Sequence, residues 1–590
     1  MCGITGIISY DRNDNIQSVN EMNDVLQHRG PDGMGIYSDD FGNQNITLGH
    51  RRLSIIDLSK RGSQPMEIGD WVITFNGEIY NYIELRSILE GEGIEFYSDS
   101  DTEVLLRLFI KHGEKSLELL EGMFAFAIYN KQNGQVFIAR DRFGEKPFYY
   151  LQENNKFIFA SELKAIKQIH KNVHVNQKMI YRYLLSGEMH NIDDLSETFY
   201  EEIKQLKPGF YAILENFELK QNKYWNPEIY NHELDFDSCS QKFKSLFNDS
   251  LNRRLRSDVP IGTSLSGGLD SSFIACSINR IGTHNFSTFS AKFPGFKKDE
   301  SSYIETVRNS IDSSNYDVFT DNNSIYDEFS KVLSFQDEPV LSPSIITQYK
   351  VFATSRKNGV KVLLDGQGAD EILGGYTGYI DAYLIELISK RDYQSAISFL
   401  TSYLKWNRGN DINSNFSRIL KLLFKIIFGA DRMNVIQLRN IKNISKDNRI
   451  NTFINDMSYG QDKFEKKNIS LKETLKSDTL VGGMQDLLRF ADRNSMANSI
   501  EVRLPFLSHH ILEFLMCVPP EFFIREGKTK AILRSSAKGI VPKEIQQRKD
   551  KIGYEPPSFK WHSFHDYNLI KEENNLDFRL ANLAQLKLNF

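Results

Sequence analysis

The stretch Ser266-Gly267-Gly268-Leu269-Asp270-Ser271-Ser272 decides the fold of the second half of this chain. It follows residues 258–265, which predict a buried strand ending in Leu265, and it precedes residues 273–278, which predict the start of a helix. Because the two glycines have no side chains, an anion can come within hydrogen-bonding distance of the backbone N–H groups of the loop. The N-terminus of the following helix adds a positive partial charge at the same place. A strand, a glycine-rich loop and a helix in this order predict a phosphate-binding loop.

The side chains of this loop suit a nucleotide with a bound metal ion. The hydroxyls of Ser266, Ser271 and Ser272 can donate to phosphate oxygens, and Asp270 can hold Mg²⁺ beside them. No lysine follows the glycines, so this is not the Walker pattern. An ordinary polar turn is the alternative. The run resembles the pyrophosphate-binding loop of the ATP pyrophosphatase superfamily, which implies ATP and Mg²⁺ as cofactors and cleavage to AMP and pyrophosphate.

A second strand, glycine-rich loop and helix spans residues 360–376. Strands that alternate with helices predict a parallel sheet whose ligands bind at the strand C-termini. We therefore expect Asp365 and Gly366 at the nucleotide, and Asp370 opposite Asp270 as a second magnesium ligand. The resemblance further implies that Gln367, Asp370 and Glu371 lie near an acyl-adenylate. It also implies that the backbone of Ala291, near the end of a predicted strand, contacts the adenine.

Bulk properties narrow the class of protein. The chain has 590 residues, of which 40% are hydrophobic, enough for several buried cores. Its net charge of -5 gives no indication of nucleic-acid binding, and its four cysteines are scattered without a CxxC pair. We find neither a signal peptide nor an apolar run near the roughly 20 residues of a membrane span. The sequence thus predicts a soluble, cytoplasmic protein without disulfides or zinc.

The N-terminus offers a nucleophile. Removal of Met1 would leave Cys2 with a free α-amino group next to its thiol, a nucleophile with its own base. A buried structural cysteine is the alternative. Four further blocks follow in order, at residues 28–33 (HRGPDG), 51–57 (RRLSIID), 76–81 (NGEIYN) and 100–103 (SDTE).

These blocks resemble the glutaminase domain of the class II glutamine amidotransferases, which are N-terminal nucleophile hydrolases with an αββα sandwich. The resemblance implies that Cys2 attacks the glutamine amide, while the amide of Asn76 and the N–H of Gly77 form the oxyanion hole. The resemblance also implies that Arg52 binds the α-carboxylate. Neighbouring Arg51 points to the opposite face of the strand. Asp101 would bind the α-ammonium, with Glu78 in the same pocket.

Later runs complete the pattern, at residues 492–497, 501–507, 527–530 and 548–554. Together with the two glycine loops they resemble the glutamine-hydrolysing asparagine synthetases. The resemblance places Lys551 at the acyl-adenylate, whereas Lys528 and Lys530 could equally be surface charges. We predict an α/β protein with two domains. An αββα glutaminase domain would span 2–210, and a parallel-sheet synthetase domain would span 237–590, with a helical basic insert near 381–480.

The insert is the part that fits the family least well. Residues 386–450 hold twelve Lys and Arg against five Asp and Glu, and 418–428 form a basic amphipathic pattern. Such a helix can lie on a membrane surface. More often it is half-buried in its own domain, and that reading is favoured.

The predicted reaction is glutamine- and ATP-dependent conversion of L-aspartate to L-asparagine, with ammonia passed internally between the domains. One departure affects the acceptor. Family members commonly read Ser-Gly-Glu-Gly where this chain reads Asp365-Gly366-Gln367-Gly368. Amidation of a sugar acid for surface polysaccharides is therefore the alternative. The intact motifs disfavour a non-catalytic homologue, and the glutaminase half disfavours a nucleic-acid-modifying enzyme. A homodimer is left open.

Overall fold

The computed structural model describes residues 1–10, 15–230, 234–282, 286–296, 298–319, 322–407, 470–550 and 575–588. Lys551 and the basic pattern at 418–428, both singled out from the sequence, lie outside the described residues. Within the described part of the chain, no helix is both long and apolar enough to cross a membrane.

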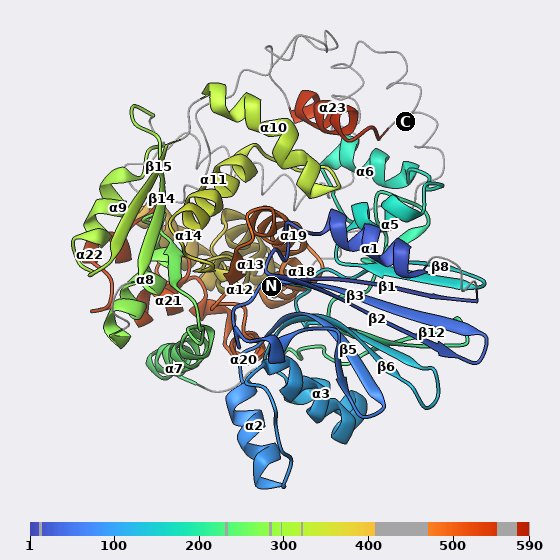
Figure 1. The fold of residues 1–590 in the computed structure, drawn as a ribbon. Coiled ribbons are helices and arrows are strands. Elements are labelled where there is room, and N and C mark those ends of the chain that lie inside the picture. Colours follow the sequence, from blue (N-terminus) through green and yellow to red (C-terminus); the bar gives the residue numbers. More distant parts are fainter. Residues whose placement is uncertain are drawn as a thin grey trace.

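The first half is built on two six-stranded antiparallel sheets (Figure 1). The first sheet has the strand order β10 (Ile203–Gln205), β8 (Tyr149–Glu153), β9 (Lys156–Ala160), β1 (Gly3–Ser9), β3 (Gln44–Arg52) and β2 (Gly33–Phe41). The second has the order β12 (Glu218–Lys223), β11 (Phe210–Glu215), β7 (Val136–Arg140), β6 (Gly122–Asn130), β5 (Trp71–Ile79) and β4 (Met66–Ile68).

The two sheets pack face to face, with helices on their outer faces. Side chains such as Ile4, Ile8, Val72 and Ala125 share the core between the sheets. Helices α1 (Asn15–Val25) and α5 (Leu163–Ile169) cover the first sheet, and α3 (Asp101–His112) covers the second. Short helices α2 (Tyr82–Gly91), α4 (Ser116–Leu119) and α6 (Gln177–Ser186) complete this half. The predicted αββα sandwich is confirmed.

The second sheet extends beyond the boundary predicted near residue 210. Strands β11 and β12 carry it on to Lys223, and the register pairs Phe210 with Lys223. Strand β12 lies at the edge of the sheet and none of its six residues is buried. Its polar sequence therefore lacks the alternation of a half-buried strand, which explains why the predicted domains leave residues 211–236 unassigned.

The second half contains the predicted parallel sheet. Its strand order is β15 (Ser314–Phe319), β14 (Ser287–Lys292), β13 (Ile261–Ser264), β16 (Val362–Leu364) and β17 (Glu501–Arg503). The helices of this half are α7 (Phe236–Arg254), α8 (Leu269–Ile281), α9 (Ser301–Arg308), α10 (Asn322–Gln336), α11 (Ser344–Lys357), α12 (Ala369–Leu373), α20 (His509–Cys517), α21 (Ala531–Ser536) and α22 (Lys543–Gln546). Helix α23 (Asn575–Gln585) lies away from the sheet and packs against α6 and α10.

The described flanks of the insert are helical. They comprise α13 (Thr377–Ser389), α14 (Tyr393–Trp406) and α18 (Leu471–Leu480), and α19 (Gly483–Met496) follows. Helix α19 lies at the centre of the molecule, between the sandwich and the parallel sheet (Figure 1). Its Asp492 carboxylate accepts hydrogen bonds of 2.8 and 2.9 Å from the buried guanidinium of Arg29 in the first half. The two halves therefore meet through buried charges.

Candidate active sites

The first site forms where β1 begins beside β5. The Cys2 N–H donates to Asn76 Oδ1 at 2.9 Å. The Asn76 Nδ2 amide is buried, and no hydrogen-bond partner reaches it from the described residues. A buried donor without a partner is rare unless a ligand supplies the acceptor. A Cβ on Gly77 would lie 2.1 Å from the Met123 carbonyl oxygen, so only glycine fits there.

The Cys2 thiol is buried, with 8% of the residue exposed. Burial raises the pKa of this thiol, while the nearby N-terminal ammonium opposes the shift. That ammonium belongs to Met1, and it donates to Glu501 Oε2 at 2.9 Å. Since Glu501 lies on β17, the second half of the chain reaches the N-terminus next to the nucleophile.

Arg52 offers a positive charge at the end of β3. Its guanidinium donates to the carbonyl oxygens of Ser59, at 2.7 Å, and Asp57. These neutral carbonyl groups orient the guanidinium of Arg52 but leave its positive charge unpaired by them, so Arg52 can still bind a carboxylate. Arg51 instead pairs with Asp24 at 2.8 Å, as expected because consecutive residues of a strand point to opposite faces.

Two buried carboxylates complete this pocket. Asp101 accepts a hydrogen bond of 2.9 Å from the Ile79 N–H, and burial raises its pKa to about 6. Burial, and then the charge of Asp101, raises the pKa of Glu78 well above its ordinary value. The guanidinium of Arg503 opposes that shift from 3.4 Å. Sequence reasoning did not assign a role to Arg503, although it lies in the family run 501–507.

The second site is a cavity of about 770 Å³ over the C-terminal end of the parallel sheet. The two predicted glycine loops meet there. They are so close that a Cβ added to Gly366 of the second loop would lie 3.1 Å from the Cβ of Asp270 in the first. Gly267 has φ of +71°, and a Cβ on it would lie 2.7 Å from Tyr303 Cβ. Both loops therefore approach their neighbours more closely than a larger residue would allow.

Asp270 and Asp370, the predicted magnesium ligands, converge on one lysine. Lys530 Nζ lies 2.7 Å from both oxygens of Asp270 and 2.6 Å from Asp370 Oδ1. Burial lowers the pKa of this ammonium, and the carboxylates oppose that change. Lys530 therefore belongs to the site, which settles the alternative left open by the sequence. Lys528 instead lies partly exposed, with its ammonium 4.9 Å from the Trp406 ring centroid.

Two carboxylates that face each other across the loops suit a divalent cation shared with phosphate oxygens. Among the described residues, no group of three or more His, Cys, Asp or Glu side chains is placed to hold a metal ion alone. Asp270 and Asp370 are the residues that would hold Mg²⁺ together with a nucleotide.

Of the remaining residues predicted at the nucleotide, some line the cavity and others do not. Ser266, Gly268 and Ser271 line the cavity, and the Ser271 hydroxyl accepts from the Ser266 N–H at 3.2 Å. The Ser272 hydroxyl is buried, and within the described chain it has no hydrogen-bond partner. Leu265 is fixed by a 2.9 Å bond from its N–H to the Phe289 carbonyl, and Ala291 is buried on β14.

The loop after β16 lines the rest of the cavity with Asp365, Gly366, Gln367 and Glu371. The Tyr376 hydroxyl donates to Glu371 Oε1 at 2.7 Å, and burial raises the pKa of this carboxyl. The Asp365 N–H donates to the Arg503 carbonyl oxygen at 3.0 Å.

Arg548 also lines the cavity, beside the nucleotide loop, and sequence reasoning did not assign it to the site. It donates to the Gly267 carbonyl at 3.0 Å and pairs with Glu300 at 2.7 Å and with Asp550 at 3.0 Å. Its guanidinium therefore fixes the carbonyl side of the glycine loop, leaving the N–H side for an anion.

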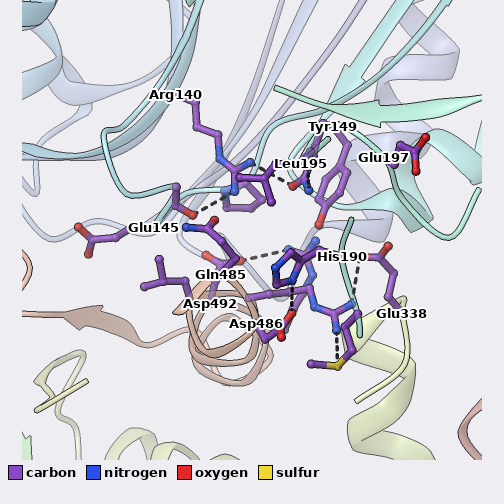
Figure 2. A pocket seen from close by; sticks show the side chains of 17 residues that line it. Arg140, Glu145, Tyr149, His190, Leu195, Glu197, Glu338, Gln485, Asp486 and Asp492 are labelled. Carbon is purple, nitrogen blue, oxygen red and sulfur yellow. Dashed lines mark hydrogen bonds and ion pairs between the residues drawn. The ribbon is translucent and has the colours of Figure 1, made fainter. Parts of the chain in front are cut away.

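A small polar pocket of about 40 Å³ lies at the junction of the two halves (Figure 2). Figure 2 shows His190 pointing at Asp486 of α19, and the His190 Nδ1 to Asp486 oxygen distance is 2.7 Å. The nearby Arg489 pairs with Glu338 at 3.1 Å. This volume holds little more than a water molecule or two. The pocket is therefore part of the domain contact and not a substrate site.

Comparison with known proteins identifies the two halves separately. Residues 1–225 match the family described as "Glutamine amidotransferase domain", and residues 242–579 match the family described as "Asparagine synthase". The chain is 31% identical over 584 residues to "Asparagine synthetase [glutamine-hydrolyzing] 1" of Bacillus subtilis, covering 95% of this chain and 88% of the relative.

Two other relatives agree. "Asparagine synthetase [glutamine-hydrolyzing] 3" of B. subtilis is 30% identical, over 93% of this chain and 86% of the relative. "Putative asparagine synthetase [glutamine-hydrolyzing] 2" of Methanocaldococcus jannaschii is 36% identical, over 66% of this chain and 78% of the relative. These matches span both the glutaminase sandwich and the nucleotide cavity. The chain belongs to the family of glutamine-hydrolysing asparagine synthetases, and it is a ligase that makes amides with nitrogen from glutamine.

Proposed function

We propose that this enzyme converts L-aspartate, L-glutamine and ATP to L-asparagine, L-glutamate, AMP and pyrophosphate. In the first site, the Cys2 thiolate attacks the glutamine amide carbon, with the α-amine freed by removal of Met1 as its base. The tetrahedral oxyanion accepts hydrogen bonds from Asn76 Nδ2 and the Gly77 N–H. Ammonia leaves, and water then hydrolyses the thioester to glutamate.

Glutamine itself is held by charge. Arg52 binds its α-carboxylate, and Asp101 with Glu78 binds its α-ammonium. The opposite signs of these groups at the two ends of the pocket fix the orientation of the substrate, so that the side-chain amide faces Cys2.

In the second site, one oxygen of the acceptor carboxylate attacks the α-phosphorus of ATP, and pyrophosphate leaves. Ser266, Ser271 and Ser272, with the N–H groups of Gly267 and Gly268, bind the pyrophosphate part. Asp270 and Asp370 would hold Mg²⁺, which neutralises phosphate charge when bound. Lys551, which the family resemblance assigns to the acyl-adenylate, would stabilise negative charge. Ammonia from the first site attacks the acyl carbon, AMP leaves, and the amide forms.

The convergence of Asp270, Asp370 and Lys530 where the two glycine loops meet is the observation that supports this proposal most directly. The test is glutamine-dependent pyrophosphate release by the full-length enzyme with L-aspartate and with uronic acids as acceptors. Turnover at millimolar aspartate with asparagine as product supports the proposal. Turnover with a uronic acid and none with aspartate contradicts it and favours the sugar-acid alternative.

A further inference from the structure

Arg534 is a positively charged residue of the second cavity that the steps proposed above do not use. It lies in α21, one helical turn after Lys530, and its N–H donates to the Lys530 carbonyl oxygen at 2.9 Å. Residues four positions apart lie on the same face of a helix, and both of these side chains line the cavity. The Arg534 side chain is partly buried there.

The guanidinium of Arg534 is held by neutral groups. Its Nε donates to the Thr529 carbonyl oxygen at 2.8 Å, and its Nη1 donates to the Gln546 carbonyl oxygen at 2.6 Å. Within the described part of the chain, Nη2 has no hydrogen-bond partner, and no carboxylate pairs directly with this guanidinium. Two carbonyl groups therefore fix the orientation of a cation that has no direct counter-ion among the described residues.

The two arginines that line this cavity differ in how their charge is compensated. Burial lowers the pKa of Arg534, and the charge of Asp270 opposes that change without outweighing it. Burial also acts to lower the pKa of Arg548, but the ion pairs with Asp550 and Glu300 outweigh it and raise that pKa. A cation out of water is costly unless an anion pairs with it. An anionic group of the ligand would give Arg534 the partner that Arg548 already has.

The surroundings of Arg534 place it beside the phosphate-binding loop 266–272. One turn before it, the Lys530 ammonium lies 2.7 Å from both oxygens of Asp270 in that loop. Its Nη1 bond reaches the end of α22, and two residues further along the chain Arg548 donates to a carbonyl oxygen of the same loop at 3.0 Å. Both neighbours of Arg534 thus contact the loop that is proposed to bind pyrophosphate.

The proposed reaction builds up negative charge at that loop. As the acceptor carboxylate forms its bond to the α-phosphorus of ATP, the bond from this phosphorus to the bridging oxygen breaks, and the electron pair leaves with pyrophosphate. A guanidinium stays charged at neutral pH and offers N–H donors in a planar fork that matches phosphate oxygens. In Arg534, Nη2 and the second N–H of Nη1 are the donors that can bind them.

We propose that Arg534 binds the pyrophosphate part of ATP and stabilises the negative charge that this part gains as it leaves. Among the cations of the described cavity lining, Lys530 and Arg548 pair with carboxylates, and Lys549 is exposed. Arg534 is thus the partly buried cation that is left for the leaving group. The inference rests on the proposed function, because it takes that leaving group to be pyrophosphate.

The experiment is isothermal titration calorimetry of the full-length wild type, Arg534→Gln and Arg534→Lys with inorganic pyrophosphate and with AMP, both in excess Mg²⁺. AMP carries the adenine, the ribose and the α-phosphate but not the leaving group. Loss of charge-assisted hydrogen bonds predicts that Arg534→Gln binds pyrophosphate about ten- to a hundredfold more weakly. Its affinity for AMP should change less than about threefold. Arg534→Lys keeps the charge without the planar fork and should recover part of the loss.

Arg280→Gln is the matched control. Arg280 also donates to a backbone carbonyl oxygen, that of Gly539 at 3.3 Å, but it is exposed and does not line the cavity, so both affinities should stay unchanged. Equal weakening of pyrophosphate and AMP in Arg534→Gln would indicate a merely structural role and overturns the inference. So does an unchanged pyrophosphate affinity in this variant, or a wild type that does not bind pyrophosphate.

The result does not depend on which acid is the acceptor, because neither titration contains one. A wild type that turns ATP over to ADP and phosphate contradicts the proposed reaction. A selective loss of pyrophosphate affinity in Arg534→Gln would then still support the contact between Arg534 and this part of ATP.

Discussion

Lys530 provides the sharpest test of the nucleotide site. Its ammonium lies within 2.7 Å of Asp270 and Asp370, and all three side chains are largely buried. Lys530→Gln removes the cation and leaves two carboxylates that face each other. Breaking a buried ion pair in this way lowers the free energy of unfolding by about 3–5 kcal/mol. Removal of one preorganised group that stabilises charge in a transition state typically costs roughly 10²- to 10³-fold in rate. We therefore expect ammonia-dependent pyrophosphate release to fall at least about a hundredfold.

The assay is steady-state pyrophosphate release at saturating ATP, and the thermal unfolding of the whole protein, followed by circular dichroism, is the measure of correct folding. Lys528→Gln is the matched control, because it removes the same charge two residues away, over the Trp406 ring. That variant should keep its rate within about threefold, since partly exposed charges contribute little. The reasoning is refuted if Lys530→Gln retains a tenth of the wild-type rate, or if Lys528→Gln is equally damaged.

Three further predictions concern the first site. Cys2→Ala should abolish glutamate release from glutamine while leaving ammonia-dependent amidation, and failure of ammonia to rescue synthesis would contradict the separation of the sites. Burial raises the pKa of Asp101 to about 6. Protonation of the Asp101 carboxylate removes the negative charge that binds the glutamine ammonium. The KM for glutamine should therefore rise about tenfold per pH unit as the pH falls below that value. A KM that stays constant down to pH 5 would be inconsistent with this. Arg503→Gln removes the guanidinium beside Glu78 and should raise the KM for glutamine at least tenfold, whereas Arg503→Lys, which keeps the charge, should recover part of that loss.

Much of the architecture could be predicted because the relevant patterns are local. A strand, a glycine-rich loop and a helix are adjacent in sequence, so the loops at 266–272 and 365–368 could be placed on one sheet edge from the sequence. The alternation of Arg51 and Arg52 likewise follows from strand geometry alone. The predicted αββα and parallel-sheet folds are confirmed for the same reason.

Features that depend on contacts between residues far apart in the chain could not be predicted from the sequence. Lys530 is separated from Asp270 by 260 positions, and a Gly-Lys-Thr-Lys run looks the same on a surface as in a buried site. Strand β12 was missed because an edge strand with no buried residue has no hydrophobic period to detect. Arg503 was recognised as part of a family run, but only its position beside β16 and near Glu78 gives it a physical role.

Strand β17 connects the two sites through a single residue. The Arg503 side chain pairs with Glu501 at 2.6 Å and lies 3.4 Å from Glu78 in the glutamine pocket, while its carbonyl oxygen holds the Asp365 N–H at 3.0 Å. This arginine is fully buried, so neither end can move without displacing the other or leaving a charge unpaired. Arg503 thus contacts the loop that begins at Asp365 through its backbone and Glu78, the carboxylate expected to bind the glutamine ammonium, through its side chain.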